Sequence, residues 1–373
     1  MGRTDLRNFL GQLLVIGFDG TEMSPRLRSL LTRIQPAGVI LFARNIVSAE
    51  QTRQLLKACQ ACVATRMFTC VDLEGGQVDR FRNVTGPAPS AADVFTTGDR
   101  KLFRKHGRVI GEACRALGLN VDLAPVVDLA FEASRKVMGS RVVSVDPRQV
   151  TVYAREFLAG LRLAGVAGAI KHFPGLGEAN LDTHHALPSV HKSWNKLWEQ
   201  DIAPYRALRR EAAMVLLGHA AYPQVTGDRT PASLSKKWIA NILRKKIGYR
   251  GLVISDDLEM GGVLKAASIE QAMLRFILAG GDLCLICHSE EHITSCYEAL
   301  VYETESGLKF ARRAQESVTR VLAFKTKAKE LKRHAPVPTE EKVQRLSRQL
   351  WEFNEQVRLE TIKTQPVRGR ESA

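Results

Sequence analysis

Eight short apolar segments alternate with helical patterns along the chain, and this alternation constrains the fold more than any other feature. The segments lie at 13–18, 38–42, 68–72, 121–126, 168–173, 214–219, 252–256 and 283–287. Most are near-continuous apolar runs, as expected for parallel strands that are buried on both faces. The alternation predicts a parallel α/β fold, and eight units favour a single closed (β/α)8 TIM-type barrel over an open sheet.

The segments between the predicted strands carry signals for helix starts. Ser48 and Ser268 are each followed three residues later by glutamine, and Asp146 precedes a proline that suits the first helical position. No predicted strand is followed by a well-formed G-x-G-x-x-G turn, so a dinucleotide-binding fold is disfavoured.

The chain divides into a barrel and a C-terminal extension. Residues 1–333 suffice for a barrel with insertions, and the prolines in 334–339 indicate a linker. Apolar residues then recur at alternating spacings of three and four, which predicts an amphipathic helix over 340–364 that docks on the barrel or on a partner. These residues are Val343, Leu346, Leu350, Phe353 and Val357. The basic tail 365–373 is expected to be disordered.

Composition limits the class of protein. No apolar run approaches the ~18 residues of a membrane helix, and the N-terminus lacks a signal-peptide pattern, so we expect a cytoplasmic protein without membrane insertion. Seven cysteines in apolar surroundings are interpreted as small buried hydrophobes.

The net charge of +15 could attract nucleic acid, anionic lipid or an acidic substrate. No aromatic-interleaved basic run accompanies it, so we expect a solvated basic surface and no nucleic-acid partner. We also expect a monomer.

The first polar segment, residues 71–81, follows the third predicted strand. Gly75 and Gly76 allow the chain to turn tightly past the strand end. Asp72 can accept hydrogen bonds from ligand hydroxyl groups, and Arg80 can donate several. A charged loop with a purely structural turn is the alternative.

The second polar segment covers residues 169–188, and in it Lys171 and His172 end an apolar strand. A buried charge at such a position costs free energy, so these two residues are expected to have a functional role. The following loop is rich in glycine and proline and contains Asp182 and His184. In an extended loop, residues i and i+2 point the same way, so Asp182 could contact the His184 imidazole and raise its basicity. Such a histidine can act as general acid and base, although a surface ion pair is the alternative.

The third polar segment, residues 252–260, is an apolar strand that ends in Asp256 and Asp257. One carboxylate can point into the barrel mouth while the other caps the next helix, and capping by both is the alternative. A carboxylate that faces an anomeric carbon can attack it and form a glycosyl-enzyme. Since catalytic groups of a barrel lie at the C-terminal ends of its strands, the three segments predict one active site at that rim.

Taken in this order, the three segments resemble glycoside hydrolase family 3, in particular its bacterial β-N-acetylhexosaminidases. The signature is a Lys-His-Phe-Pro-Gly run with its trailing Asp-x-His, joined to Ser-Asp-Asp-Leu-x-Met. The resemblance runs from about residue 13 to residue 324. It also includes the segments 38–45, 123–128, 139–141, 219–223 and 231–235.

The resemblance implies a role for each matching residue. Asp256 matches the nucleophile, His184 the acid/base and Asp182 its partner. The residues that match sugar-binding positions are Asp72, Arg80, Arg141, Lys171 and His172. It further implies retaining hydrolysis of terminal β-linked N-acetylglucosamine through a covalent glycosyl-aspartate, without metal or other cofactor. The implied substrate is an amino-sugar oligosaccharide or a muropeptide, processed in the cytoplasm during peptidoglycan recycling.

The chain departs from the common family pattern in several places. Leu176 and Glu178 stand where many relatives have histidine and aspartate, Gln77 stands where arginine is frequent, and Val142 and Val143 replace a more usual Ser-Phe. These departures leave the proposed nucleophile and the Asp-x-His pair unchanged.

Other functions stay open at this point. They are another family 3 β-glycosidase, an N-acetylglucosaminide phosphorylase, a metal-dependent hydrolase and a non-catalytic nucleic-acid binder. A metal centre would use His172, His184, His185 and His191 with Asp182, although these spacings fit no standard metal motif. Products formed with and without phosphate would separate hydrolysis from phosphorolysis.

Overall fold

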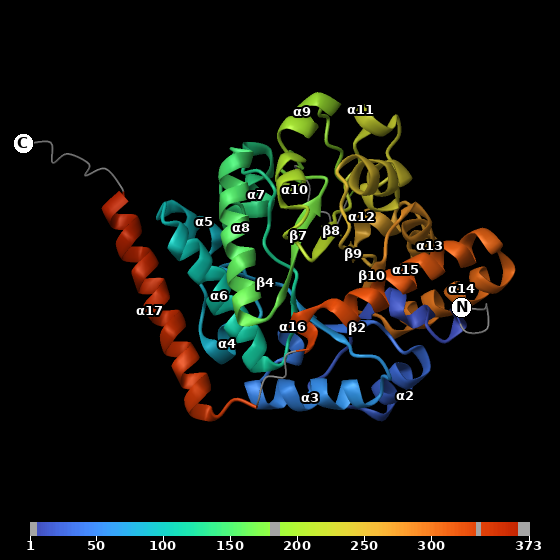
Figure 1. Cartoon of the computed structure of the whole chain (residues 1–373), viewed down its shortest axis with the longest axis horizontal. Helices are drawn as coiled ribbons and strands as arrows, with labels where there is room; N and C mark the ends of the chain where they lie inside the picture. The colour runs from blue at the N-terminus through green and yellow to red at the C-terminus, as the bar shows by residue number, and fades with distance from the viewer. Residues whose placement is uncertain (1–5, 180–186, 333–336, 365–373) are drawn as a thin grey trace, which may run out of the picture.

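A computed structural model describes residues 6–179, 187–332 and 337–364. Its centre is a closed barrel of eight parallel strands (Figure 1). These are β1 (Leu14–Ile16), β2 (Gly38–Leu41), β3 (Phe68–Val71), β6 (Val121–Asp122), β7 (Ala167–Phe173), β8 (Met214–Leu217), β9 (Leu252–Asp257) and β10 (Leu283–Ile286). Each predicted strand overlaps one of them, so the predicted fold class is confirmed.

The barrel strands are neighbours in the order in which they follow one another along the chain, and β1 closes the barrel against β10. In the closing pair, Leu14 lies opposite Cys284 and Ile16 opposite Ile286. Because all eight strands are parallel, their C-terminal ends meet at one rim, which brings the polar ends of β3, β7 and β9 together.

Helices surround the barrel (Figure 1). The longer ones are α2 (Pro25–Ile34), α3 (Ala49–Ala61), α6 (Arg100–Leu117), α8 (Pro147–Ala164), η6 (Lys237–Lys246), α13 (Ile269–Ala279), α14 (Glu290–Ser306), α15 (Leu308–Lys327) and α17 (Glu340–Thr364). The shorter ones are η1 (Leu10–Leu13), η2 (Ala43–Asn45), α4 (Arg82–Thr85), α5 (Ala91–Thr96), η3 (Glu132–Ser134), α7 (Arg135–Met138), η4 (Gly139–Arg141), α9 (Trp194–Glu199), α10 (Ala203–Leu208), α11 (Pro223–Thr226), η5 (Ala232–Leu234), α12 (Gly261–Leu264) and α16 (Lys329–Lys332). The three predicted caps are in place, because the side chains of Ser48, Asp146 and Ser268 accept backbone N–H groups of α3, α8 and α13.

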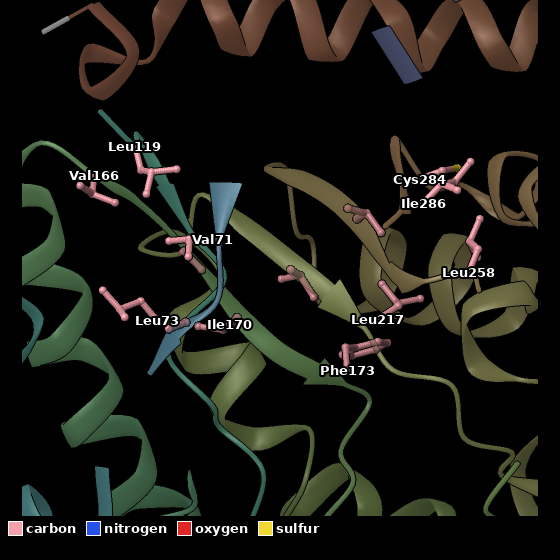
Figure 2. Packing of buried hydrophobic residues seen from close by; sticks show 14 of the residues in the cluster. Val71, Leu73, Leu119, Val166, Ile170, Phe173, Leu217, Leu258, Cys284 and Ile286 are labelled. Atoms are coloured by element: carbon pink, nitrogen blue, oxygen red, sulfur yellow. The ribbon is translucent and has the colours of Figure 1, made fainter. Parts of the chain in front are cut away.

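Two apolar layers hold the barrel together, because successive strand residues point to opposite faces. On β2, Val39 and Leu41 belong to the layer shared with the helices, whereas Ile40 belongs to the layer inside the barrel. Figure 2 shows part of the outer layer, including Val71 and Ile170. Truncating a fully buried residue of either layer to alanine should cost about 2–5 kcal/mol of stability.

A small hairpin interrupts the alternation after β3. Its strands β4 (Leu73–Gly75) and β5 (Val78–Asp79) pair antiparallel. Gly75 and Gly76 have φ values of 82° and 60°, and a Cβ on Gly75 would lie 2.1 Å from the Pro89 carbonyl oxygen. The predicted Gly-Gly turn is therefore present, but the sequence did not predict the two short strands beside it.

The predicted C-terminal helix is α17, which packs on the barrel wall against α4, α5 and α6 (Figure 1). Leu346, Leu350, Phe353 and Val357 are buried there, and Asn354 Nδ2 donates to the Pro87 carbonyl at 2.6 Å. Residues 333–336 and 365–373 lie outside the described residues, so the predicted linker and tail stay predictions.

None of the helices in the described ranges has the length and apolar character needed to cross a bilayer. All seven cysteines are free thiols, and six of them are buried.

Candidate active site

A cavity of about 150 Å³ lies at the rim where the strands end. Segments that are far apart in the sequence build it, since its walls come from the β3–β5 region, η4, β7 and β9. Six of the eight residues that the sequence singled out line it, namely Asp72, Arg80, Arg141, Lys171, His172 and Asp256. The other lining residues are Glu74, Val78, Val137, Met138, Leu176, Ala179 and Leu216.

A network of buried charges forms one wall of the cavity. Lys171, at the end of β7, places Nζ 2.6 Å from both Asp72 Oδ1 and Glu74 Oε1. Arg141 donates to both Glu74 oxygens, each at 2.8 Å. The two cations and two carboxylates balance one another, which a water-poor site requires.

Opposing effects act on the protonation of this network. Burial alone would raise the pKa of Glu74, but Arg141 and Lys171 outweigh it and hold that pKa well below its usual range. Burial lowers the pKa of Lys171, yet Asp72 and Glu74 raise it above its ordinary value. Glu74 and Lys171 therefore keep their charges near neutral pH and act as a fixed acceptor and a fixed donor.

Asp128 organises the segment that follows β7. Its carboxylate is fully buried and lies 2.7 Å from His172 Nδ1, and it also accepts the backbone N–H of Leu176 at 2.7 Å. A carboxylate can only accept, so His172 carries a proton on Nδ1 and directs Nε2 away from Asp128. Asp128 thereby fixes both the ring and the start of the following loop.

The two carboxylates at the end of β9 have different surroundings. Asp256 lines the cavity, and its Oδ1 accepts the backbone N–H of Asp257 at 3.0 Å. Asp257 turns aside, because its Oδ1 accepts the Glu259 N–H at 3.1 Å. Asp256 thus faces the cavity as the sequence suggested. The expectation that the second carboxylate caps the next helix was wrong, because α12 (Gly261–Leu264) begins after Met260 without a side-chain cap and Asp257 instead holds the turn before it.

His219 supports the end of β9 from β8. Its Nε2 lies 2.9 Å from the Asp257 carbonyl oxygen and its Nδ1 lies 2.8 Å from Ser233 Oγ. Burial lowers the pKa of His219, so the ring is neutral and donates from Nε2 to the carbonyl. A neutral, fully buried histidine thus holds the backbone next to Asp256.

Arg80 forms another part of the wall. Its guanidinium carbon lies 5.6 Å from the centroid of the Phe42 ring, a cation–π distance. Its buried Nε atom has no hydrogen-bond partner among the described residues. This donor is available to a ligand.

Asp182 and His184 lie outside the described residues, so their predicted roles stay predictions. The residues just before them border the cavity, since Leu176 and Ala179 line it. Glu178, one of the departures from the family pattern, pairs with buried Lys192 at 3.2 Å.

Sequence reasoning assigned no role to two residues of the site, Glu74 and Asp128. Glu74 lies two positions after a predicted site residue, and Asp128 ends a family-like segment, but only the fold shows which cations and rings they contact. For a metal centre, the described residues bring no three histidine, cysteine, aspartate or glutamate side chains together.

Comparison with known proteins identifies the family of this chain. The sequence profile described as the glycosyl hydrolase family 3 N terminal domain matches residues 5–324. A protein named beta-hexosaminidase from Stenotrophomonas maltophilia is 35% identical over 285 residues, which cover 74% of this chain and 84% of that protein. The protein of the same name from Xanthomonas campestris pv. campestris is also 35% identical over 285 residues, covering 74% and 85%.

Solved structures give the same result. A glycoside hydrolase family 3 beta-N-acetylglucosaminidase from Paenibacillus sp. superposes with a TM-score of 0.86 at 32% identity, covering 93% of this chain and 68% of that one. The beta-N-acetylglucosaminidase from Thermotoga maritima gives a TM-score of 0.75 at 28% identity, covering 86% and 68%. The match over most of the barrel shows that this chain belongs to glycoside hydrolase family 3 and is a glycoside hydrolase.

Proposed function

We propose that the protein is a retaining β-N-acetylglucosaminidase that removes terminal β-linked N-acetylglucosamine. The observation that carries the proposal is the position of Asp256, whose carboxylate lines the same small cavity as the network of Lys171, Asp72, Glu74 and Arg141. Fixed donors and acceptors of this kind suit sugar hydroxyl and amide groups. The similarity to proteins named beta-hexosaminidase and beta-N-acetylglucosaminidase supports an amino sugar as the substrate.

In the proposed mechanism, Asp256 attacks C1 of the bound sugar and forms a covalent glycosyl-aspartate. His184, paired with Asp182, first gives a proton to the leaving oxygen and then takes one from the incoming water. Two inversions at C1 retain the β configuration. No metal or other cofactor takes part in these steps.

The side chains around the cavity orient the sugar. Asp72 accepts from hydroxyl groups, while Lys171, Arg141 and Arg80 donate to sugar oxygens. His172, with its proton on Nδ1, offers Nε2 as an acceptor for a sugar hydroxyl group. Val137 and Met138 supply an apolar surface in the same cavity, which suits the methyl of an acetamido group. We further propose that the natural substrates are muropeptides from peptidoglycan and that the enzyme acts as a monomer in the cytoplasm.

An assay of the purified protein on an aryl N-acetyl-β-glucosaminide beside the matching aryl β-glucoside tests the proposal. We expect turnover of the first and at least about 100-fold less of the second, because a site built to bind a polar group rejects an analogue that lacks it. Free N-acetylglucosamine should form at the same rate with or without phosphate. Faster cleavage of the glucoside, or a sugar phosphate as the main product, would contradict the proposal.

A further inference from the structure

A basic groove runs along the outer wall of the barrel, with α6 as its floor and α8 and α17 as its sides. Two adjoining hollows of about 460 and 380 Å³ form it and share Arg108 and Leu163. Eight cationic side chains line the groove, namely Arg100, Lys101, Arg104, Lys105, Arg108, Arg115, Lys342 and Arg345.

The cations of α6 lie on one face of that helix. Their spacing of one, three or seven residues keeps them on the same side, while the opposite side buries residues such as Phe103 and Ile110 against the barrel. From Arg100 to Arg115 this face extends about 22 Å at 1.5 Å per residue. The groove therefore presents a long, narrow row of positive charge.

Two carboxylates line the groove among the residues that the structure describes. Glu156 accepts both Arg100 and Arg104, and Glu112 pairs with Arg108 at 2.7 Å. The side chains of Arg100, Arg104 and Arg108 are still 62%, 54% and 61% exposed. Because the cations outnumber the carboxylates along the groove even when Arg115 is left out, the groove stays positive and attracts an extended anion.

The groove begins near the active-site rim. Barrel helices run antiparallel to the strands, so the Arg100 end of α6 lies toward the C-terminal ends of the strands. The preceding helix α5 contacts η4, which ends at Arg141 in the cavity wall. Helix α17 runs the opposite way, because Thr361 meets Thr96 of α5 at 3.1 Å whereas Lys342 lines the hollow with Arg115.

The shape and chemistry of the groove favour one kind of occupant. None of the described residues that line it is aromatic, so it lacks the stacking surfaces on which single-stranded nucleic acid is held. We infer that the groove binds a linear glycan that carries carboxylates, and, resting on the proposed function, that an end of this chain presents its amino sugar to the cavity.

Fluorescence anisotropy with a labelled hyaluronan decasaccharide tests this inference, since that probe alternates glucuronate with N-acetylglucosamine. The full chain is used with Asp256→Ala, which prevents turnover of the probe. The test variant adds Lys101→Gln, Arg108→Gln and Arg345→Gln. Its matched control adds Lys245→Gln, Arg275→Gln and Lys309→Gln, three exposed cations on η6, α13 and α15, of which α13 and α15 lie across the barrel from α17 in Figure 1.

We expect the groove variant to bind the probe about tenfold more weakly, whereas the control changes affinity less than about threefold. Binding of neutral chitohexaose should be the same in both. Equal losses in the two variants, no binding of the probe, or tighter binding of single-stranded DNA or of anionic phospholipid vesicles would overturn the inference. With Asp256 restored, both variants should turn over the aryl glycoside normally, so a failed assay there would count against the proposed function and not against the groove.

Discussion

The Glu74 carboxylate and the Arg141 guanidinium form a bidentate ion pair, in which Nε and Nη2 each lie 2.8 Å from one carboxylate oxygen. The pair joins the hairpin after β3 to the segment before α8, and both segments line the cavity. Lys171 of β7 contacts the same carboxylate. Glu74 thus ties three segments of the barrel rim together.

Glu74→Gln should weaken both folding and catalysis. Loss of the charge leaves Lys171 and Arg141 buried and short of one anion, which should cost about 2–4 kcal/mol of stability. The displaced cations should also lower kcat/KM for an aryl N-acetyl-β-glucosaminide by about tenfold or more. Denaturant unfolding and steady-state kinetics measure the two effects.

Glu156→Gln is the matched control for this prediction. Glu156 is a buried carboxylate with two arginine partners, but it lies on the outer wall of the barrel. The Glu156→Gln variant should be less stable than the parent protein but should keep its kcat/KM. If Glu74→Gln also kept full kcat/KM, Glu74 would have no part in organising the cavity.

His184→Ala should slow the enzyme according to the leaving group. General acid catalysis contributes about 10²–10⁴-fold, and an activated aryl group needs little of it. We therefore expect a loss of at least about 100-fold on a disaccharide and a much smaller loss in the first step on a dinitrophenyl glycoside. Asp182→Asn should reduce the rate to a value between those of the parent protein and His184→Ala. His191→Ala, at an exposed histidine, should match the parent protein, and an equal loss on every substrate would argue against His184 as the acid.

Lys325→Met should stabilise the protein in a pH-dependent way. Burial lowers the pKa of Lys325 to about 7, and its ammonium group has neutral hydrogen-bond partners: Nζ lies 2.6 Å from Gln12 Oε1 and 3.3 Å from Thr65 Oγ1. Between about pH 7 and 10 the unfolded chain holds more protons at this site than the folded chain. The contribution of Lys325 to the free energy of unfolding therefore rises with pH over that range, by roughly 2–4 kcal/mol.

The methionine variant should gain most below pH 7, where the folded protein must hold a buried charge. The unpaired Gln12 amide offsets part of the gain, by about 1 kcal/mol. Urea unfolding of both proteins from pH 6 to 9 measures the difference, with Lys327→Met at an exposed lysine as control. A difference that does not change with pH would show that Lys325 does not titrate in this range.

The sequence predicted the barrel well and the site in part. Parallel strands buried on both faces leave apolar runs such as 214–219, which can be recognised without a structure. Asp256 and Lys171 were found because a charge at the end of such a run is unusual. No role was predicted for Glu74 because its partner Arg141 lies 67 positions away, or for Asp128 because its partner His172 lies 44 positions away. Pairings over such distances depend on how the barrel closes.

The most direct test of the account is intact-mass analysis after incubation with a slow fluorinated N-acetylglucosaminide, followed by peptide mapping. The account predicts a mass increase of one sugar residue, located on Asp256 and absent in Asp256→Ala. An unmodified protein that still releases product with retained configuration, or a label on any other side chain, would contradict it.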